Sequence, residues 1–326
     1  MKLLKPPRLN KGDTIGVIAP SYPVAPRFQT MYDQGIRNLT SFGFKIKEGK
    51  TIRLTHKGYM AGTDRQRAED VNEMFKDKDV NAIICALGGS VAIHTLRYLD
   101  YDMIKRNPKI FSGMSNITTF HIAFLAKTNL AGLHQTDIVF GFGADMESKE
   151  AKYETNLFFK ITESPQAIGL LPAFTKWDVW REGKAAGKLF GGSINSAETL
   201  LGTPFYPKIE EDIIFFWESI GQPLDELDAK LAHFRETGLL DKTRGMLIGK
   251  FRDEVPDSES KTGSRIVERT GEIKELVMDL VAEYDFPIIS GMDFGHYTPN
   301  LPLPLGLQAE MDTNGIKVSI KESFVK

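Results

Sequence analysis

The sequence predicts an α/β fold with two domains, and three features support this prediction. At 326 residues the chain is longer than one hydrophobic core usually grows, so two domains that share a cleft are expected. From residue 14 to about 145, short apolar runs alternate with longer segments of helical period, which is typical of parallel strands joined by helices. The second half has separate strands, two helices and a closing hairpin. We expect a Rossmann-like or flavodoxin-like parallel sheet in residues 1–165, a connection at 166–185 and a smaller α/β domain at 186–326.

Local signals in the first half predict its strands and helices in order. Residues 14–20 form the first expected strand, and a helix over 28–42 follows, with Gly43 as its C-terminal stop. Thr63 and Gln66 have the spacing of a capping box, which opens a helix with apolar positions at Ala68, Val71 and Phe75. Strands are then expected at 80–87 and 109–114, followed by helical stretches at 94–99 and 116–126.

Residues 145–185 show weak periodicity and Lys-Glu charge runs, so we interpret them as the region that connects the domains. Beyond them the pattern predicts strands at 184–190, 213–218 and 245–251, and helices at 225–236 and 268–284. A closing hairpin is expected where Asn314-Gly315 separates the alternating runs 307–311 and 316–320, because both turn residues can take positive φ.

Composition and charge exclude several classes of function. The formal net charge is −2 and the two signs are interspersed, so the chain lacks a field that would attract a nucleic acid polymer or an anionic membrane. No signal peptide or bilayer-spanning window is apparent, which predicts a cytoplasmic location. The single cysteine, Cys85, lies in an apolar run and is expected to be a buried structural thiol. Neither metal-type Cys and His spacing nor a P-loop occurs, so we expect no metal and no cofactor.

Ser115 is the strongest candidate for a catalytic side chain. It falls between an expected strand and an expected helix, on a sharp turn that exposes a side chain at the carboxyl edge of the sheet. The turn also directs the next backbone N–H groups into the same space, as an acyl-transfer nucleophile requires. Gly88-Gly89-Ser90 follows the strand at 80–87, where ligand-binding loops lie. Its glycine pair and the N–H of Asn116 could stabilise an oxyanion, although a glycine pair can also serve only as a tight connection.

A serine nucleophile needs a base and a group that orients the base. His296 stands out because it lies in an irregular loop after an apolar run, beside Gly295, which allows close approach to a substrate. His134 ends another apolar run and could also reach a cleft. Glu218 ends the apolar run 213–217, where a charge needs a partner or water, although a strand surfacing into a polar turn would look the same. The remaining histidines are expected to be structural: His56, His94, His121 and His233.

Taken together and in this order, these segments resemble the LD-carboxypeptidase family of serine peptidases, which includes the microcin C immunity peptidases. The resemblance covers nearly the whole chain and rests on the ordered set, because no single motif would suffice. The segments are Val17-Ile18-Ala19-Pro20-Ser21, Ala61-Gly62-Thr63-Asp64 with Arg67-Ala68, Leu87-Gly88-Gly89, Gly113-Met114-Ser115-Asn116-Ile117-Thr118, Gly191-Gly192-Ser193-Ile194-Asn195, Gly202-Thr203-Pro204, Phe216-Trp217-Glu218, and Gly295-His296 followed by Leu303-Pro304-Leu305-Gly306.

The resemblance implies a Ser-Glu-His triad in chain order, formed here by Ser115, Glu218 and His296. It places the serine in the N-terminal domain and the other two residues in the C-terminal domain. It also implies a cytoplasmic homodimer without a metal, and a C-terminal domain with a swivelling β-barrel-like core.

The resemblance further implies an oxyanion hole at Gly89 and Asn116. Gly88 and Ser90 are expected to contact substrate because they lie in the loop at the end of the strand at 80–87. This chain departs from the family at two positions, because the family usually has Tyr before the serine and Asp after it. Here these residues are Met114 and Asn116. A backbone N–H donor survives such a change, but any role of the aspartate carboxylate does not.

Substrate separates two branches of the family. The muropeptide branch removes terminal D-Ala from murein tetrapeptides, and the microcin branch cleaves the amide that joins a peptide or aminoacyl group to a modified nucleotide. Residues 176–183 resemble the tryptophan-bearing loop of the microcin branch, so Trp177 and Trp180 are predicted to bind substrate by stacking on a nucleobase. Tryptophans in a domain connection can equally pin two domains together. We favour the aminoacyl-nucleotide substrate, with the murein peptide as the alternative and a non-catalytic small-ligand-binding protein as a further one.

Overall fold

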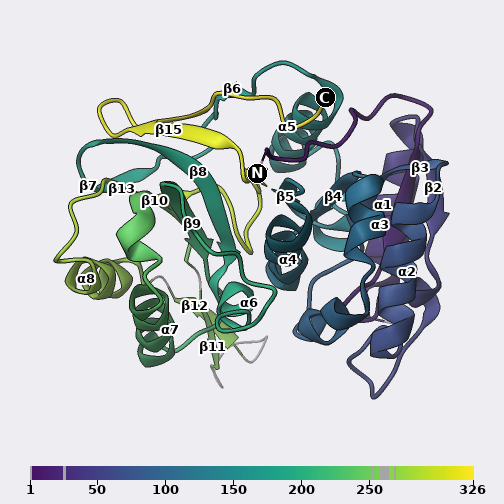
Figure 1. Cartoon of the computed structure of the whole chain (residues 1–326), viewed down its shortest axis with the longest axis horizontal. Helices are drawn as coiled ribbons and strands as arrows, with labels where there is room; N and C mark the ends of the chain where they lie inside the picture. The colour runs from purple at the N-terminus through teal and green to yellow at the C-terminus, as the bar shows by residue number, and fades with distance from the viewer. Residues whose placement is uncertain (1, 25–26, 252, 257–263, 268) are drawn as a thin grey trace.

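The computed structural model describes residues 2–24, 27–251, 253–256, 264–267 and 269–326. Two sheets with their helices lie side by side, one built mainly from each half of the chain (Figure 1). The buried hydrophobic side chains of both halves form one continuous cluster. Within the described residues, no helix is both long and apolar enough to cross a membrane.

The first sheet has six strands in the order β14-β5-β4-β3-β1-β2. The five strands from the first half are parallel and have the flavodoxin-like order 2-1-3-4-5, which confirms the predicted fold class. The sixth, β14, comes from near the C-terminus and pairs antiparallel with β5. The strands are β1 (Thr14–Ile18), β2 (Lys45–Glu48), β3 (Val80–Cys85), β4 (Ile110–Gly113), β5 (Gly132–His134) and β14 (Leu303–Leu305).

The predicted capping box and helix stop of the first half form as expected, but the helices at Tyr101–Arg106 and Lys149–Glu163 were not predicted. Thr63 and Gln66 form the expected capping box, with Thr63 N donating to Gln66 Oε1 at 2.9 Å. Gly43, at φ +92°, follows the first helix and terminates it. The helices are α1 (Gln29–Ser41), α2 (Asp64–Lys76), α3 (Tyr101–Arg106), α4 (Thr118–Thr128) and α5 (Lys149–Glu163), with short turns η1 (Lys50–Arg53), η2 (Ala92–Tyr98), η3 (Ser115–Ile117) and η4 (Ile138–Phe142). Of these, α4 lies on the side that faces the second sheet (Figure 1).

The second sheet is mixed and has eight strands in the order β6-β16-β15-β8-β9-β10-β13-β7. Its four central strands, from β8 to β13, are parallel, and the flanking pairs are antiparallel. The strands are β6 (Gly169–Leu170), β7 (Asp178–Arg181), β8 (Lys184–Ser193), β9 (Ile213–Glu218), β10 (Thr243–Gly249), β13 (Ile288–Met292), β15 (Gln308–Asp312) and β16 (Lys317–Ile320). The remaining elements are α6 (Ile194–Glu198), α7 (Leu224–Glu236), η5 (Leu240–Lys242), α8 (Thr270–Leu280) and the separate hairpin β11 (Asp253–Pro256) and β12 (Ser264–Val267).

Several sequence expectations differ from the structure. Residues 145–185 are not a plain connection, because they contain the 15-residue helix α5 and the two edge strands β6 and β7. Those end strands do not pair with each other among the described residues, so the barrel-like core is not observed as a closed sheet. The closing hairpin forms, but the positive φ angles fall on Gly315 and Ile316 rather than on Asn314. The α8 helix is also shorter than the predicted 268–284.

Candidate active site

Ser115 lies on a strained turn between β4 and α4. Its φ of +57° is in the left-handed region, which non-glycine residues rarely adopt and which costs roughly 1–3 kcal/mol. The turn is stabilised by a hydrogen bond from Ile117 N to Met114 O at 3.0 Å. Gly88 packs directly against the serine, because a Cβ added there would lie 2.8 Å from Ser115 Cβ. This packing explains why a glycine occupies the loop after β3.

The structure brings Ser115, His296 and Glu218 together from three distant parts of the chain. His296 Nε2 lies 3.0 Å from Ser115 Oγ, and its Nδ1 lies 2.7 Å from Glu218 Oε2. A carboxylate can only accept, so the ring carries its proton on Nδ1 and donates it to Glu218. Nε2 is then free to accept the hydrogen bond that Ser115 Oγ donates. Glu218 ends β9 and is fully buried, which fixes the far end of this chain of hydrogen bonds.

Burial and charge act in opposite directions on His296 and Glu218. Burial alone would lower the pKa of His296, but the Glu218 carboxylate and then Asp137 raise it above its ordinary value of 6.5. Burial alone would raise the pKa of Glu218, but the charge and hydrogen bond of His296 hold it below its usual value. The pair therefore combines an ionised carboxylate with an imidazole of increased basicity, which suits a base that must take a proton from a hydroxyl.

The glycine pair and Asn116 lie next to Ser115. Gly89 has φ +143°, and a Cβ there would come within 2.5 Å of both Ser21 and Tyr22, so this position requires glycine. The Asn116 side chain is buried, and its Oδ1 accepts from Ser21 Oγ at 2.7 Å and from Ala92 N at 2.8 Å. Its Nδ2 donates to Ser196 Oγ of α6 at 3.2 Å, so the amide links the serine turn to the second half of the chain.

Ser115 and His296 line a cavity of about 540 Å³, together with Gly88 and Gly89. Ser90 is exposed, outside the lining, and its Oγ donates to the hydroxyl of Tyr22 at 3.1 Å. The other walls are mostly apolar or aromatic: Tyr22, Phe28, Met31, Leu87, Met114, Phe140, Ile220 and Tyr297. Three of these, Met31, Phe140 and Ile220, are among the six most exposed large hydrophobic residues of the described chain. Such a concentration of exposed apolar surface in one cavity is typical of a ligand-binding site.

The two predicted tryptophan contacts do not reach this cavity. Trp177 is only 2% exposed, and its Nε1 donates to Asp293 Oδ2 at 2.8 Å. Trp180 lies within β7 and is 9% exposed. Neither indole belongs to the cavity lining. The prediction that they stack on substrate is therefore not supported by this geometry, because both rings are committed to packing within the second half.

Sequence reasoning missed several residues of the cavity. Asp137 follows β5, and its Oδ1 accepts from Phe140 N at 2.8 Å. Burial raises the pKa of its carboxyl group to about 7. Its position could have indicated Asp137 as a site residue, because β5 is the next parallel strand after β4 and its carboxyl end lies at the same edge of the sheet as Ser115. Phe140 and Ile220 carried no such signal, since single apolar residues in loops are common.

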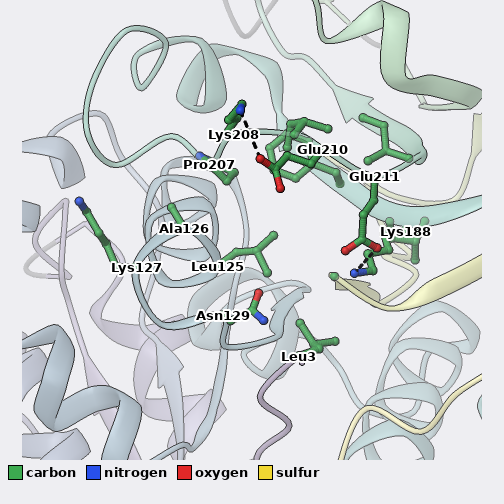
Figure 2. Close-up of a pocket in the computed structure, with 15 residues that line it drawn as sticks. Leu3, Leu125, Ala126, Lys127, Asn129, Lys188, Pro207, Lys208, Glu210 and Glu211 are labelled. Carbon is green, nitrogen blue, oxygen red and sulfur yellow. Dashed lines mark ion pairs between the residues drawn. The ribbon is translucent and has the colours of Figure 1, made fainter. Parts of the chain in front are cut away.

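A second cavity, of about 400 Å³, opens between the end of α4 and the strands β8 and β9 (Figure 2). Four of its five charged residues form ion pairs, Lys188 with Glu211 at 2.5 Å and Lys208 with Glu210 at 3.2 Å, and the fifth is Lys127. Neither Ser115 nor any other predicted site residue lines it. Within the described residues, no group of three or more His, Cys, Asp or Glu side chains could hold a metal ion.

Comparison with known proteins agrees with the resemblance seen in the sequence. Residues 15–135 match the LD-carboxypeptidase N-terminal domain and residues 186–311 the C-terminal domain. The chain is 32% identical over 309 residues to the probable murein peptide carboxypeptidase of Bacillus subtilis, covering 95% of this chain and 92% of the relative. It is 28% identical over 338 residues to the microcin C7 self-immunity protein MccF of Escherichia coli, covering 96% and 94%. A solved structure of MccF in complex with aspartyl sulfamoyl adenosine superimposes with a TM-score of 0.87 at 25% identity, covering 99% of this chain and 100% of that one.

Proposed function

Since the chain belongs to the LD-carboxypeptidase family, we propose that it is a serine amidohydrolase with Ser115, His296 and Glu218 as its catalytic triad. The family membership and the carboxypeptidase names of its relatives make it an enzyme rather than a binding protein. The observation that carries the proposal is the 3.0 Å contact between Ser115 Oγ and His296 Nε2, with Glu218 behind the imidazole.

In the proposed reaction, Ser115 Oγ attacks the carbonyl carbon of an amide while His296 Nε2 takes the hydroxyl proton. The imidazolium, stabilised by Glu218, then gives that proton to the leaving nitrogen as the C–N bond breaks. Water, deprotonated by the same imidazole, hydrolyses the acyl-enzyme and regenerates the serine. Backbone N–H groups at Gly89 and Asn116 stabilise the tetrahedral oxyanion in this proposal, which is supported because Gly89 lines the same cavity as Ser115 and Asn116 directly follows the serine.

For the substrate, we propose an amide that joins an aminoacyl or peptidyl group to a nucleotide-like group. The cavity walls favour a large, flat and weakly charged group, because the described lining contains Asp137 and His296 but no lysine or arginine. A terminal carboxylate would gain from a cation that this lining lacks. Phe140 is 48% exposed at the cavity and packs edge-on against Phe28 with ring centroids 5.3 Å apart, so we propose Phe140, and not a tryptophan, as the stacking surface.

Removal of terminal D-Ala from a murein tetrapeptide is the second candidate function. It is favoured by the 32% identity to a relative named as a probable murein peptide carboxypeptidase. The homodimer and the cytoplasmic location suggested by the family remain predictions.

The two candidates are separated by a side-by-side mass-spectrometric assay with a murein tetrapeptide and an aminoacyl sulfamoyl adenosine. We expect cleavage of the nucleotide substrate, and loss of that cleavage in the Ser115→Ala variant, whose fold should persist because a hydroxyl in a cavity contributes little to packing. Cleavage of the tetrapeptide alone would reject the proposed substrate but keep the triad. Wild-type turnover by Ser115→Ala would reject the mechanism itself.

A further inference from the structure

A buried amide, the side chain of Asn300, helps to hold the loop that carries His296. Asn300 has no exposed surface, and its side chain brackets Gly295, the residue before the histidine. Its Oδ1 accepts from Gly295 N at 3.3 Å, and its Nδ2 donates to Gly295 O at 2.5 Å. Because the N–H and the C=O of Gly295 are both bound, this amide restricts the two peptide units that flank Gly295, immediately before the imidazole.

The same amide also reaches the loop of the proposed nucleophile. Asn300 Nδ2 lies 3.2 Å from Met114 Sδ, and Met114 directly precedes Ser115. Asn300 therefore contacts the residue before the base and the residue before the nucleophile. These two loops come from different halves of the chain, and the proposed reaction depends on their separation.

Asn300 is in turn anchored to the first half of the chain by Glu154 of α5. Asn300 N donates to Glu154 Oε1 at 2.6 Å, and Thr136 Oγ1 donates to Glu154 Oε2 at 2.7 Å. Glu154 is 4% exposed, so a buried carboxyl group with two hydrogen-bonded partners fixes the position of Asn300. Neither Asn300 nor Glu154 lines the cavity, which leaves both without contact to a substrate bound there.

We infer that Asn300, anchored by Glu154, is a positioning residue that sets the distance between His296 Nε2 and Ser115 Oγ. The inference rests on the proposed function, because it assigns these two residues to the support of that triad. Small displacements of a base from its nucleophile are costly, with about a hundredfold loss of rate for a shift of about 1 Å.

The test measures the rate at which a fluorophosphonate probe labels Ser115 in the full chain, as a function of pH. For Asn300→Ala we expect a loss of roughly a hundredfold in labelling rate at the pH plateau. The matched control is Asn72→Ala, which removes a two-sided amide outside the cavity lining: Asn72 Nδ2 donates to Tyr98 O at 3.1 Å, and its Oδ1 accepts from Asp100 N at 2.9 Å. The control should label at the wild-type rate.

The pH profile separates positioning from general stability. The groups that face His296 are Glu218 from β9, Asp137 after β5 and His134 from β5. If Asn300 holds the imidazole against Glu218, its removal weakens that pairing, and the pKa of His296 falls. The rising limb of the labelling profile should then move to lower pH in Asn300→Ala while the plateau drops. A merely structural residue would leave the limb in place.

A second pair of variants keeps the test decisive if Asn300→Ala fails to fold. Glu154→Gln retains an oxygen that accepts from Asn300 N and should label near the wild-type rate, whereas Glu154→Leu removes it and should lose rate with the same shift of the limb. Folded variants that all label at the wild-type rate, or that lose rate without a shifted limb, would overturn the inference. Absence of Ser115 labelling in the wild type would instead count against the proposed function.

Discussion

Ser115 keeps a backbone conformation that few non-glycine residues adopt, and its neighbours explain why it can. Gly88 leaves no side chain at the point where the serine packs, and Asn116 ties the turn to both halves of the chain. Glu218 then matters less as a stabilising ion pair than as a group that orients His296, because a buried pair gains little net stability after desolvation. Its main expected effect is on the basicity of the imidazole.

We predict that Glu218→Gln lowers kcat/KM by on the order of 10⁴-fold, since an amide cannot hold the required tautomer and removes the charge. In the wild type, activity should rise with pH as His296 loses its proton. The midpoint of this rising limb should lie above the ordinary histidine pKa of 6.5, because Glu218 raises the pKa of His296. In the variant the limb should move to lower pH. The pH dependence of kcat/KM checks this.

The matched control for that variant is Glu198→Gln. Glu198 Oε1 contacts His233 Nδ1 at 3.1 Å in a comparatively exposed pair outside the cavity. The control therefore makes the same Glu-to-Gln change beside a histidine that does not line the cavity. An equal loss in both variants, or an unmoved limb in Glu218→Gln, would argue against the orienting role.

Among individual residues, the sequence predicted Ser115, Glu218 and His296 as candidates but missed Asn300 and Glu154. The first three stand at the ends of recognisable strands or in an irregular loop, where local pattern gives a signal. Asn300 and Glu154 are hydrogen-bonded to each other although they lie 146 positions apart in the chain, and no local sequence pattern indicates such a contact.

Strand β9 places Glu218 at its end, and Ser193 at the end of the neighbouring strand β8 is paired in register with it. Gly191 makes this close pairing possible. A Cβ at Gly191 would lie 1.7 Å from Phe216 O, and its φ of +144° also disfavours a side chain.

Gly191→Ala should therefore destabilise the fold by about 3 kcal/mol or more, through overpacking against the neighbouring backbone together with strain. Urea unfolding measures the change. Gly271→Ala in α8 is the control, since an added Cβ there meets nothing within 4 Å and alanine is the better helix former by about 1 kcal/mol. A Gly191→Ala midpoint equal to that of the wild type would show that the strand pair tolerates the methyl group.

The elements that the sequence missed are short or carry polar residues on a buried face. The strands β6, β7 and β14 have two to four residues, too few to show alternation. The α5 helix buries Ala151, Leu157, Phe158 and Ile161, but Glu154 lies in the same buried stripe. That buried carboxyl group obscured the amphipathic pattern, and its partners come from elsewhere in the fold.

The two halves of the molecule share structure rather than only a cleft. β14 comes from the second half of the chain but completes the first sheet, and the hydrophobic cluster runs through both halves. Domain boundaries drawn from the sequence alone could not predict this arrangement, because no local sequence pattern shows that a strand will pair with a sheet built from the other half of the chain.

Such sharing predicts one cooperative unfolding transition in urea. The chain offers a probe for each half: its single cysteine, Cys85, is buried at the end of β3, and its three tryptophans, Trp177, Trp180 and Trp217, are buried in the second half. Reactivity of Cys85 with a thiol reagent and tryptophan fluorescence should change at the same urea concentration. Exposure of Cys85 at a lower concentration would indicate that the halves unfold separately.

In the proposed mechanism, Ser115 of the first half is activated only when the second half brings the imidazole of His296 to it. The most direct measurement is intact-protein and peptide mass spectrometry after reaction with a fluorophosphonate. We expect one adduct per chain, located on Ser115, in the wild type, and none above background in folded His296→Gln. Equal labelling of Ser115 in the two proteins, or an adduct on another residue only, would contradict this mechanism.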